Sequence, residues 1–158
     1  MEKQPKLIDL SYLNSIADGN KEIINELIDI FIEQVPEFTQ GLDEYYKNKQ
    51  WLELGGLAHK AKSSVIAMGM EEMGNVDLKN LELLAKKRQI EAIESQTIVT
   101  IKEQEILDRL SQNILAYDKN RQIWVQENDN DGTFKQIINK FVTHCEDAIN
   151  ELKFIKNS

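Results

Sequence analysis

Apolar residues recur along most of the chain at spacings of three and four, which is the repeat of amphipathic helices. Two prolines and seven glycines in 158 residues force few turns. The sequence therefore predicts an all-α protein that forms a single domain over residues 1–158. The expected helices cover Leu10–Ala17 with Asp9 as N-cap, a stretch from about Asn20 to Tyr45 that Pro36 is expected to kink, Trp51–Met68, Glu71–Lys87 and Thr133–Ile155.

Residues 89–132 carry two competing patterns. The segment Gln96–Ile101 is rich in β-branched residues, which favour a strand. The residues after it return to helical spacing, with Ile106, Leu110 and Ile114 as examples. We expect the whole segment to be mostly helical.

Composition and charge exclude several classes of function. With 27 acidic and 19 basic side chains the net charge is −8, which would repel a phosphate backbone, so no nucleic-acid partner is expected. The single cysteine, Cys145, allows no internal disulfide and no cysteine-clustered metal site, and its spacing places it in the core. No apolar run reaches the roughly 18 residues of a membrane span, and the first residues lack the apolar region of a signal peptide. We expect a cytoplasmic monomer with no membrane partner.

The acidic, turn-forming segment Asn128–Gly132 has some likeness to a calcium-binding loop. Such a loop needs a glutamate at its twelfth position, and the residue at that position counted from Asp129 is Lys140. The sequence therefore disfavours calcium, and no metal is expected.

The segment Trp51–Met70 contains one of the two histidines and separates into two faces on a helical wheel. Measured from His59, one group of residues lies within roughly 60° of it and the other group lies on the opposite, apolar side. The first group is Leu52, Gly55, Gly56, Lys62, Ser63 and Ile66, and the second is Leu54, Leu57, Ala61, Ser64, Val65 and Met68. Because the second group forms the core face, His59 is expected to point to solvent.

Two adjacent glycines inside a helix each cost about 1 kcal/mol relative to alanine, so they need a reason other than stability. Gly55 and Gly56 lie one turn before His59, and the small Ser63 lies one turn after it. We expect these residues to clear the surface around the imidazole, with Leu52 and Ile66 as exposed apolar residues at either end. Such a surface is typical of docking to another protein.

A solvent-exposed imidazole has a pKa near ~6.5, so it is partly neutral in the cytoplasm and its free nitrogen can attack phosphorus. Lys62 lies beside His59 and can neutralise a transferred phosphoryl group. Lys60 points about 100° away and is expected to contact an acidic partner. A metal site lacks ligands, and a serine hydrolase lacks the strand-to-helix elbow. The other histidine, His144, is interpreted as an interfacial residue.

The segment Leu57–Ser64, followed by Met68-Gly69-Met70, resembles the signature of histidine-containing phosphotransfer (HPt) domains, commonly A-H-x-L-K-G-S and then a glycine. Phe31–Leu42, the connector Lys49–Trp51 and Leu78–Ala85 are also similar to that family. Ala61 stands for the usual leucine and Ser63 for the usual glycine, and both are small. The resemblance implies an up-down four-helix bundle with a short N-terminal helix, a core of about residues 8–88 and 133–156, and an insertion over about 89–132.

The same resemblance implies that His59 accepts a phosphoryl group, Lys62 stabilises it and Ser63 is a small docking position. The partners are then response-regulator receiver domains and a hybrid histidine kinase, and the magnesium ion belongs to the receiver. The chain has no nucleotide-binding glycine loop, so it is expected to be a phosphocarrier without a cofactor of its own and not an autonomous kinase. A helical module that binds receivers without accepting phosphate remains the alternative. A bundle that holds a metal or haem is disfavoured, because no ligand pairs face its core.

Overall fold

The computed structural model describes residues 7–158, and within them the chain forms helices and connecting segments but no strand. This confirms the all-α prediction. The elements are α1 (Ser11–Ile16), α2 (Lys21–Lys47), α3 (Trp51–Ala67), the π-helical η1 (Met73–Leu78), α4 (Lys79–Glu94), α5 (Ile101–Leu115), α6 (Lys119–Glu127) and α7 (Asp131–Lys156).

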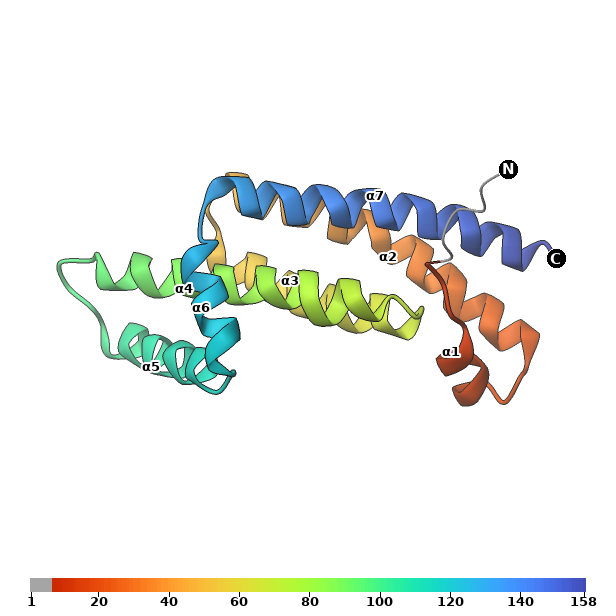
Figure 1. Cartoon of the computed structure of the whole chain (residues 1–158), viewed down its shortest axis with the longest axis horizontal. Coiled ribbons are helices and arrows are strands. Elements are labelled where there is room, and N and C mark those ends of the chain that lie inside the picture. Colours follow the sequence, from red (N-terminus) through yellow and green to blue (C-terminus); the bar gives the residue numbers. More distant parts are fainter. Residues whose placement is uncertain (1–6) are drawn as a thin grey trace.

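The core lies where α2, α3, α4 and α7 pack together (Figure 1). Helix α3 packs between α2 and α4, and α7 packs along α2 and contacts η1 and α4. The largest fully buried side chains include four phenylalanines, and burial of each contributes about 2–3 kcal/mol. These are Phe31 and Phe38 of α2 and Phe134 and Phe141 of α7. Cys145 is buried among them as predicted, and this burial raises the pKa of its thiol to about 12.

The ends of the first two helices depart slightly from the prediction. The side chain of Asn20 accepts hydrogen bonds from two backbone N–H groups of α2 and caps it. The N-cap of α1 is Leu10 and not Asp9, although the Asp9 carboxylate still accepts a hydrogen bond from the Ser11 backbone N–H at 2.9 Å. Helix α2 continues through Pro36 to Lys47.

The helix that follows α3 is longer than the predicted Glu71–Lys87, because α4 continues to Glu94. Its first turns are the π-helix η1, in which Gly74 lies against α3. A Cβ atom at Gly74 would lie 2.5 Å from Cγ1 of Ile66, so only glycine fits there. This glycine lets the two helices approach closely at that end.

The region 89–132 contains the end of α4 together with α5 and α6. The prediction of helix over Gln96–Thr100 was wrong, because these residues form an irregular connection. The side chain of Thr100 instead caps α5 in a capping box with Glu103. Ile98 is 80% exposed, so no neighbouring strand or core surface is available to its β-branched side chain.

Ionic and polar contacts anchor this insertion on the rest of the protein. Asp129 pairs with Lys87 and Arg88 of α4, with both N–O distances 2.6 Å. Arg121 of α6 donates hydrogen bonds to the backbone carbonyl of Asn75 in η1 at 3.3 Å. The loop that has some likeness to a calcium site therefore contributes an ion pair instead. Residues 7–158 contain no group of three or more His, Cys, Asp or Glu side chains placed to hold a metal ion.

None of the helices in the described part of the chain combines the length and the apolar composition that a bilayer span requires.

Candidate functional site

The exposed face of α3 carries His59, whose side chain is 62% exposed to solvent. The opposite face of the helix is anchored in the core, where most of the predicted apolar residues are buried. These are Leu54, Ala61, Val65 and Met68, while Leu57 and Ser64 are half-buried. The imidazole therefore lies outside the core, at the boundary with α4.

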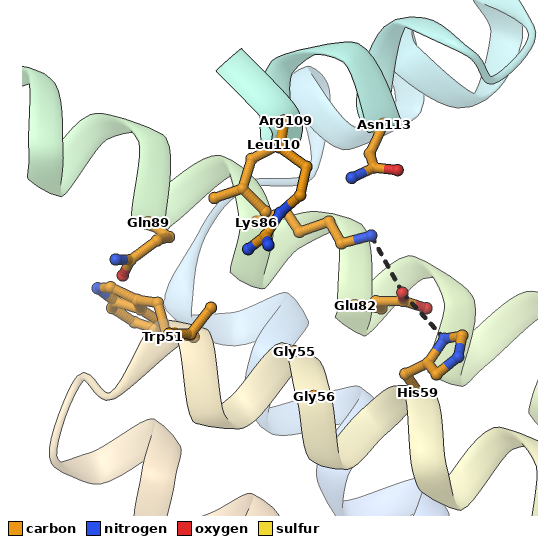
Figure 2. A pocket seen from close by; sticks show the side chains of 11 residues that line it. Trp51, Gly55, Gly56, His59, Glu82, Lys86, Gln89, Arg109, Leu110 and Asn113 are labelled. Carbon is orange, nitrogen blue, oxygen red and sulfur yellow. Dashed lines mark hydrogen bonds and ion pairs between the residues drawn. The ribbon is translucent and has the colours of Figure 1, made fainter. Parts of the chain in front are cut away.

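The Nδ1 atom of His59 lies 3.2 Å from Oε1 of Glu82 on α4 (Figure 2). The side chain of Glu82 is only 5% exposed. An ionised carboxylate can only accept hydrogen bonds, so a neutral His59 in this contact carries its proton on Nδ1. Nε2 then keeps its lone pair, and this nitrogen is the nucleophilic atom of the ring.

Three lysine ammonium groups surround the Glu82 carboxylate. The Nζ atom of Lys86 lies 3.1 Å from Oε1, while those of Lys79 and Lys62 lie 3.7 and 3.9 Å from Oε2. Burial of Glu82 favours its neutral form, but Lys86 and Lys79 outweigh that effect and hold its pKa below the ordinary value. The carboxylate is thus ionised at neutral pH. Three positive charges against one negative charge leave an excess of positive charge beside His59.

Lys62 is the member of this cluster that lies on the same helix as His59. Its side chain is only 16% exposed. Burial and the neighbouring cations Lys79 and Lys86 lower the pKa of its ammonium, and Glu82 offsets only part of this shift. A second anion bound near Lys62 would relieve the repulsion among the three lysines.

The two glycines before His59 have different roles, and the expectation that both clear the exposed face is corrected for one of them. Gly55 is buried against α4, and a Cβ atom there would lie 3.6 Å from Cβ of Ala85 and 3.8 Å from the Glu82 carbonyl oxygen. Around Gly56, by contrast, a Cβ atom would meet nothing within 4 Å. Gly55 thus lies in the contact between α3 and α4, where a methyl group would still fit, and Gly56 leaves the surface open.

The remaining residues predicted for docking are divided in the same way. Leu52 is 45% exposed and Ser63 is exposed, so both lie on the open face with Gly56. Lys60 is also exposed, and its Nζ lies 3.1 Å from Oε1 of Glu37 on α2. Ile66 was expected on this face but is half-buried, because its side chain packs on Gly74.

A cavity of about 550 Å³ opens beside His59 and is bounded by α3, α4 and α5. Trp51, Leu52 and the two glycines line its α3 side, and Glu82, Lys86 and Gln89 line its α4 side. On the opposite side, Figure 2 shows the side chains that α5 contributes, Arg109, Leu110 and Asn113. The insertion therefore reaches the edge of the site.

The second histidine lies in a different setting. Nδ1 of His144 is 2.9 Å from the backbone carbonyl oxygen of Lys140, one turn earlier in α7. The side chain of Lys140 pairs with Asp77 at 3.0 Å, and Glu71 and Glu72 line the same small cavity. His144 is half-buried at a helix interface, as the sequence suggested.

Sequence reasoning missed Glu82, Lys79 and Lys86, which complete the surroundings of His59. Glu82 follows Leu81 and lies one turn from both Leu78 and Ala85, on the apolar side of its helix. A charged residue on that side, with lysines three residues before and four residues after it, was the signal that could have identified it.

Comparison of the chain with models of known protein families, with curated proteins and with solved structures finds no match.

Proposed function

We propose that the protein is a phosphocarrier of the HPt kind, which accepts a phosphoryl group on His59 from the phosphoaspartate of a receiver domain and passes it to another receiver. The observation that carries the proposal is an exposed imidazole whose Nδ1 is held by a buried carboxylate within a group of three lysines. In this proposal the helices α2, α3, α4 and α7 form the up-down four-helix bundle of that family, and α5 and α6 are an insertion.

The chemical step follows from the tautomer that Glu82 selects. The Nε2 lone pair of His59 forms a bond to phosphorus while the bond between phosphorus and the aspartyl oxygen breaks, which returns the partner's aspartate as a carboxylate. The proton stays on Nδ1, so the ring gains positive charge, and the Glu82 carboxylate stabilises that charge at 3.2 Å. The reverse step transfers the group to the next receiver. The magnesium ion that assists this transfer is expected on the receiver.

The lysines supply the charge that the phosphoryl group needs. A phosphoryl group brings about −1.5 to −2 charges at neutral pH. Lys62, Lys79 and Lys86 carry two positive charges more than Glu82 neutralises, and the phosphorylated ring carries one more, so the negative phosphoryl group lies in an excess of positive charge. This compensation favours phosphorylation of His59.

Protein docking is supported by apolar side chains exposed on the α2 side of α3. Tyr12 and Ile16 of α1 and Ile30 of α2 are all more than half exposed, and they lie in one shallow depression with Ala67 of α3. Exposed apolar residues that gather in this way mark a surface for a partner.

The experiment is incubation of the protein with a phosphorylated receiver, followed by measurement of acid-labile, base-stable phosphate on the chain. His59→Gln should abolish uptake while the helical content by circular dichroism stays unchanged, and His144→Gln is the matched control that should be labelled normally. Continued labelling of the His59→Gln variant would show that another residue accepts the group and would refute the proposal.

The alternative is a helical module that binds receivers without accepting phosphate. The exposed apolar patch of Tyr12, Ile16 and Ile30 favours binding in either case. The alternative leaves the buried Glu82 and its three lysines without a role. The same experiment distinguishes the two functions. A receiver that binds the wild-type chain but leaves no phosphohistidine on it would favour the binding module over the phosphocarrier.

A further inference from the structure

The insertion over residues 89–132 contributes a wall to the cavity beside His59. Leu110 of α5 is buried, and Arg109 and Asn113 flank it on the exposed surface of the same helix. Figure 2 places these three side chains across the cavity from His59 and the glycines of α3. Any protein that reaches Nε2 of His59 along the open face of α3 therefore meets α5 as well.

Contacts made by residues that follow α5 attach the insertion to α4. Besides the pairs that Asp129 forms with α4, the ring of Tyr117, which follows α5, lies 4.6 Å from Nζ of Lys79. Lys79 is one of the three lysines around Glu82. The insertion is thus attached directly to the cluster that supports His59, and its wall is held in place before a partner arrives.

The chemistry of the cavity fits a partner with acidic and apolar side chains. Trp51, Leu52 and Leu110 provide apolar surface, and Arg109 and Lys86 provide positive charge at its edge. Within residues 7–158, no acidic side chain forms an ion pair with Arg109. The protein has a net charge of −8, but the guanidinium of Arg109 beside the exposed histidine is positive and is therefore complementary to an acidic side chain on a partner.

We infer that α5 is a second docking wall that selects among receiver domains, with Arg109 pairing with a carboxylate on the receiver surface and Leu110 and Trp51 receiving an apolar side chain. This inference rests on the proposed function, because the occupant is the receiver that delivers the phosphoryl group. Receivers that lack an acidic side chain at this place, or that carry a bulky element there, are rejected by α5.

The test measures the rate of phosphotransfer from a phosphorylated receiver to the full chain. Arg109→Glu should slow the transfer by about tenfold and weaken its dependence on salt, since rim charges act mainly on association. Lys119→Glu is the matched control, because Lys119 is an exposed cation of α6 outside the cavity and its replacement changes the net charge equally. Asn113→Trp fills the cavity from α5 and should slow the transfer without a change of charge.

Direct labelling with phosphoramidate, a small donor that needs no docking surface, separates loss of docking from damage to His59. The Arg109→Glu and Asn113→Trp variants should be labelled by phosphoramidate at the wild-type rate. Wild-type transfer rates in both variants, or equal slowing in Lys119→Glu, would overturn the inference while the proposed function stands. A wild-type chain that phosphoramidate labels but no receiver labels would overturn both.

Discussion

The two histidines of the chain lie on exposed or half-exposed helix surfaces and both hold Nδ1 in a contact with oxygen, yet the charges around the two rings differ. His59 contacts a buried carboxylate among three lysines, whereas His144 contacts a backbone carbonyl next to the acidic side chains of Asp77, Glu71 and Glu72. Each contact leaves Nε2 with the lone pair when the ring is neutral. The two rings thus share a tautomer and differ in the surrounding charge, so the proposed role of His59 depends on that charge.

The helix surface before each ring differs as well. Three residues before His59 is Gly56, around which the space is open, and four residues before it is the buried Gly55. Three residues before His144 is the buried Phe141, and four residues before it is the half-buried Lys140. A partner can therefore approach His59 closely, whereas the side chain of Lys140 lies next to His144.

The largest expected effect comes from making the Nδ1 contact of His59 neutral, as that of His144 already is. Glu82→Gln replaces the carboxylate with an amide, which stabilises the positive ring of the intermediate less well. We expect phosphotransfer to slow by about tenfold to a hundredfold, by analogy with the loss seen when the hydrogen-bond partner of a metal-ligating histidine is removed. Stopped-flow or gel measurement of labelling at a fixed receiver concentration gives the rate.

The same substitution leaves three lysines without their common anion, so the free energy of unfolding should fall by about 3 kcal/mol. Measurements must therefore be made where the variant is folded by circular dichroism. Asp77→Asn is the matched control, because it removes a carboxylate near His144 and leaves the surroundings of His59 intact. If Glu82→Gln and Asp77→Asn slowed transfer equally, the proposal that the Glu82 carboxylate stabilises the positive His59 ring would be wrong.

A smaller effect is expected from the lysines of α3 itself. Lys62→Gln removes one of three cations beside His59, and we expect transfer to slow by about fivefold to tenfold because Lys79 and Lys86 remain. Lys60→Gln removes an exposed cation that pairs with Glu37. Exposed pairs of this kind contribute only about 0–1 kcal/mol to the free energy of unfolding, so the fold should be little affected. Its transfer rate should change less than twofold. Equal rates in the two variants would place the stabilising charge elsewhere.

How much of this site the sequence could predict follows from the helical period. Positions within α3 repeat every 3.6 residues, so the exposure of His59 and the burial of Leu54, Ala61 and Val65 followed from spacing alone. The period says nothing about which neighbouring helix packs on the boundary between the two faces. Gly55 lies on that boundary, and only the packing of α4 against it shows that it is buried.

The end of α4 was also not predicted correctly from the sequence. A run of basic residues is typical of the last turn of a helix, because cations there interact favourably with the helix dipole. The predicted helix therefore ended at Lys87, within the run Lys86, Lys87 and Arg88. The helix continues to Glu94, and these cations pair with Glu82 and Asp129 instead. Glu82 lies in the same helix as Lys86, but Asp129 lies 42 residues after Lys87 and 41 residues after Arg88. The pairs with Asp129 could therefore not be inferred from the local pattern.

The open surface before His59 provides the next prediction. Gly56→Arg introduces a long cationic side chain where Gly56 now leaves open space. Transfer from a receiver should slow by about tenfold through lost docking, while labelling by phosphoramidate stays unchanged.

Gly56→Ala is the control for backbone effects at this position. Its Cβ meets nothing within 4 Å, so it should stabilise the fold by up to about 1 kcal/mol and leave transfer unchanged. Gly55→Leu should instead destabilise the protein by about 1–3 kcal/mol, because the space toward Ala85 accepts a methyl group but not a larger side chain. Thermal unfolding separates the two glycines, and equal effects at both would contradict their different roles.

The stability that the charge of Glu82 contributes should depend on pH. The pKa of Glu82 is lower in the folded protein than its ordinary value of 4.5, so its ionised form stabilises the fold above that value. This contribution is lost as the pH falls through the lower folded pKa, where the carboxyl becomes neutral and the three lysines lose their anion. Urea unfolding of the wild type and of Glu82→Gln should therefore differ most near neutral pH, and the difference should narrow as the pH falls below 4.5 and through the lower folded pKa. A difference that stayed constant over this range would mean that the charge of Glu82 does not stabilise the lysine cluster, and the distinction between the two histidines would then rest on the open surface at Gly56 alone.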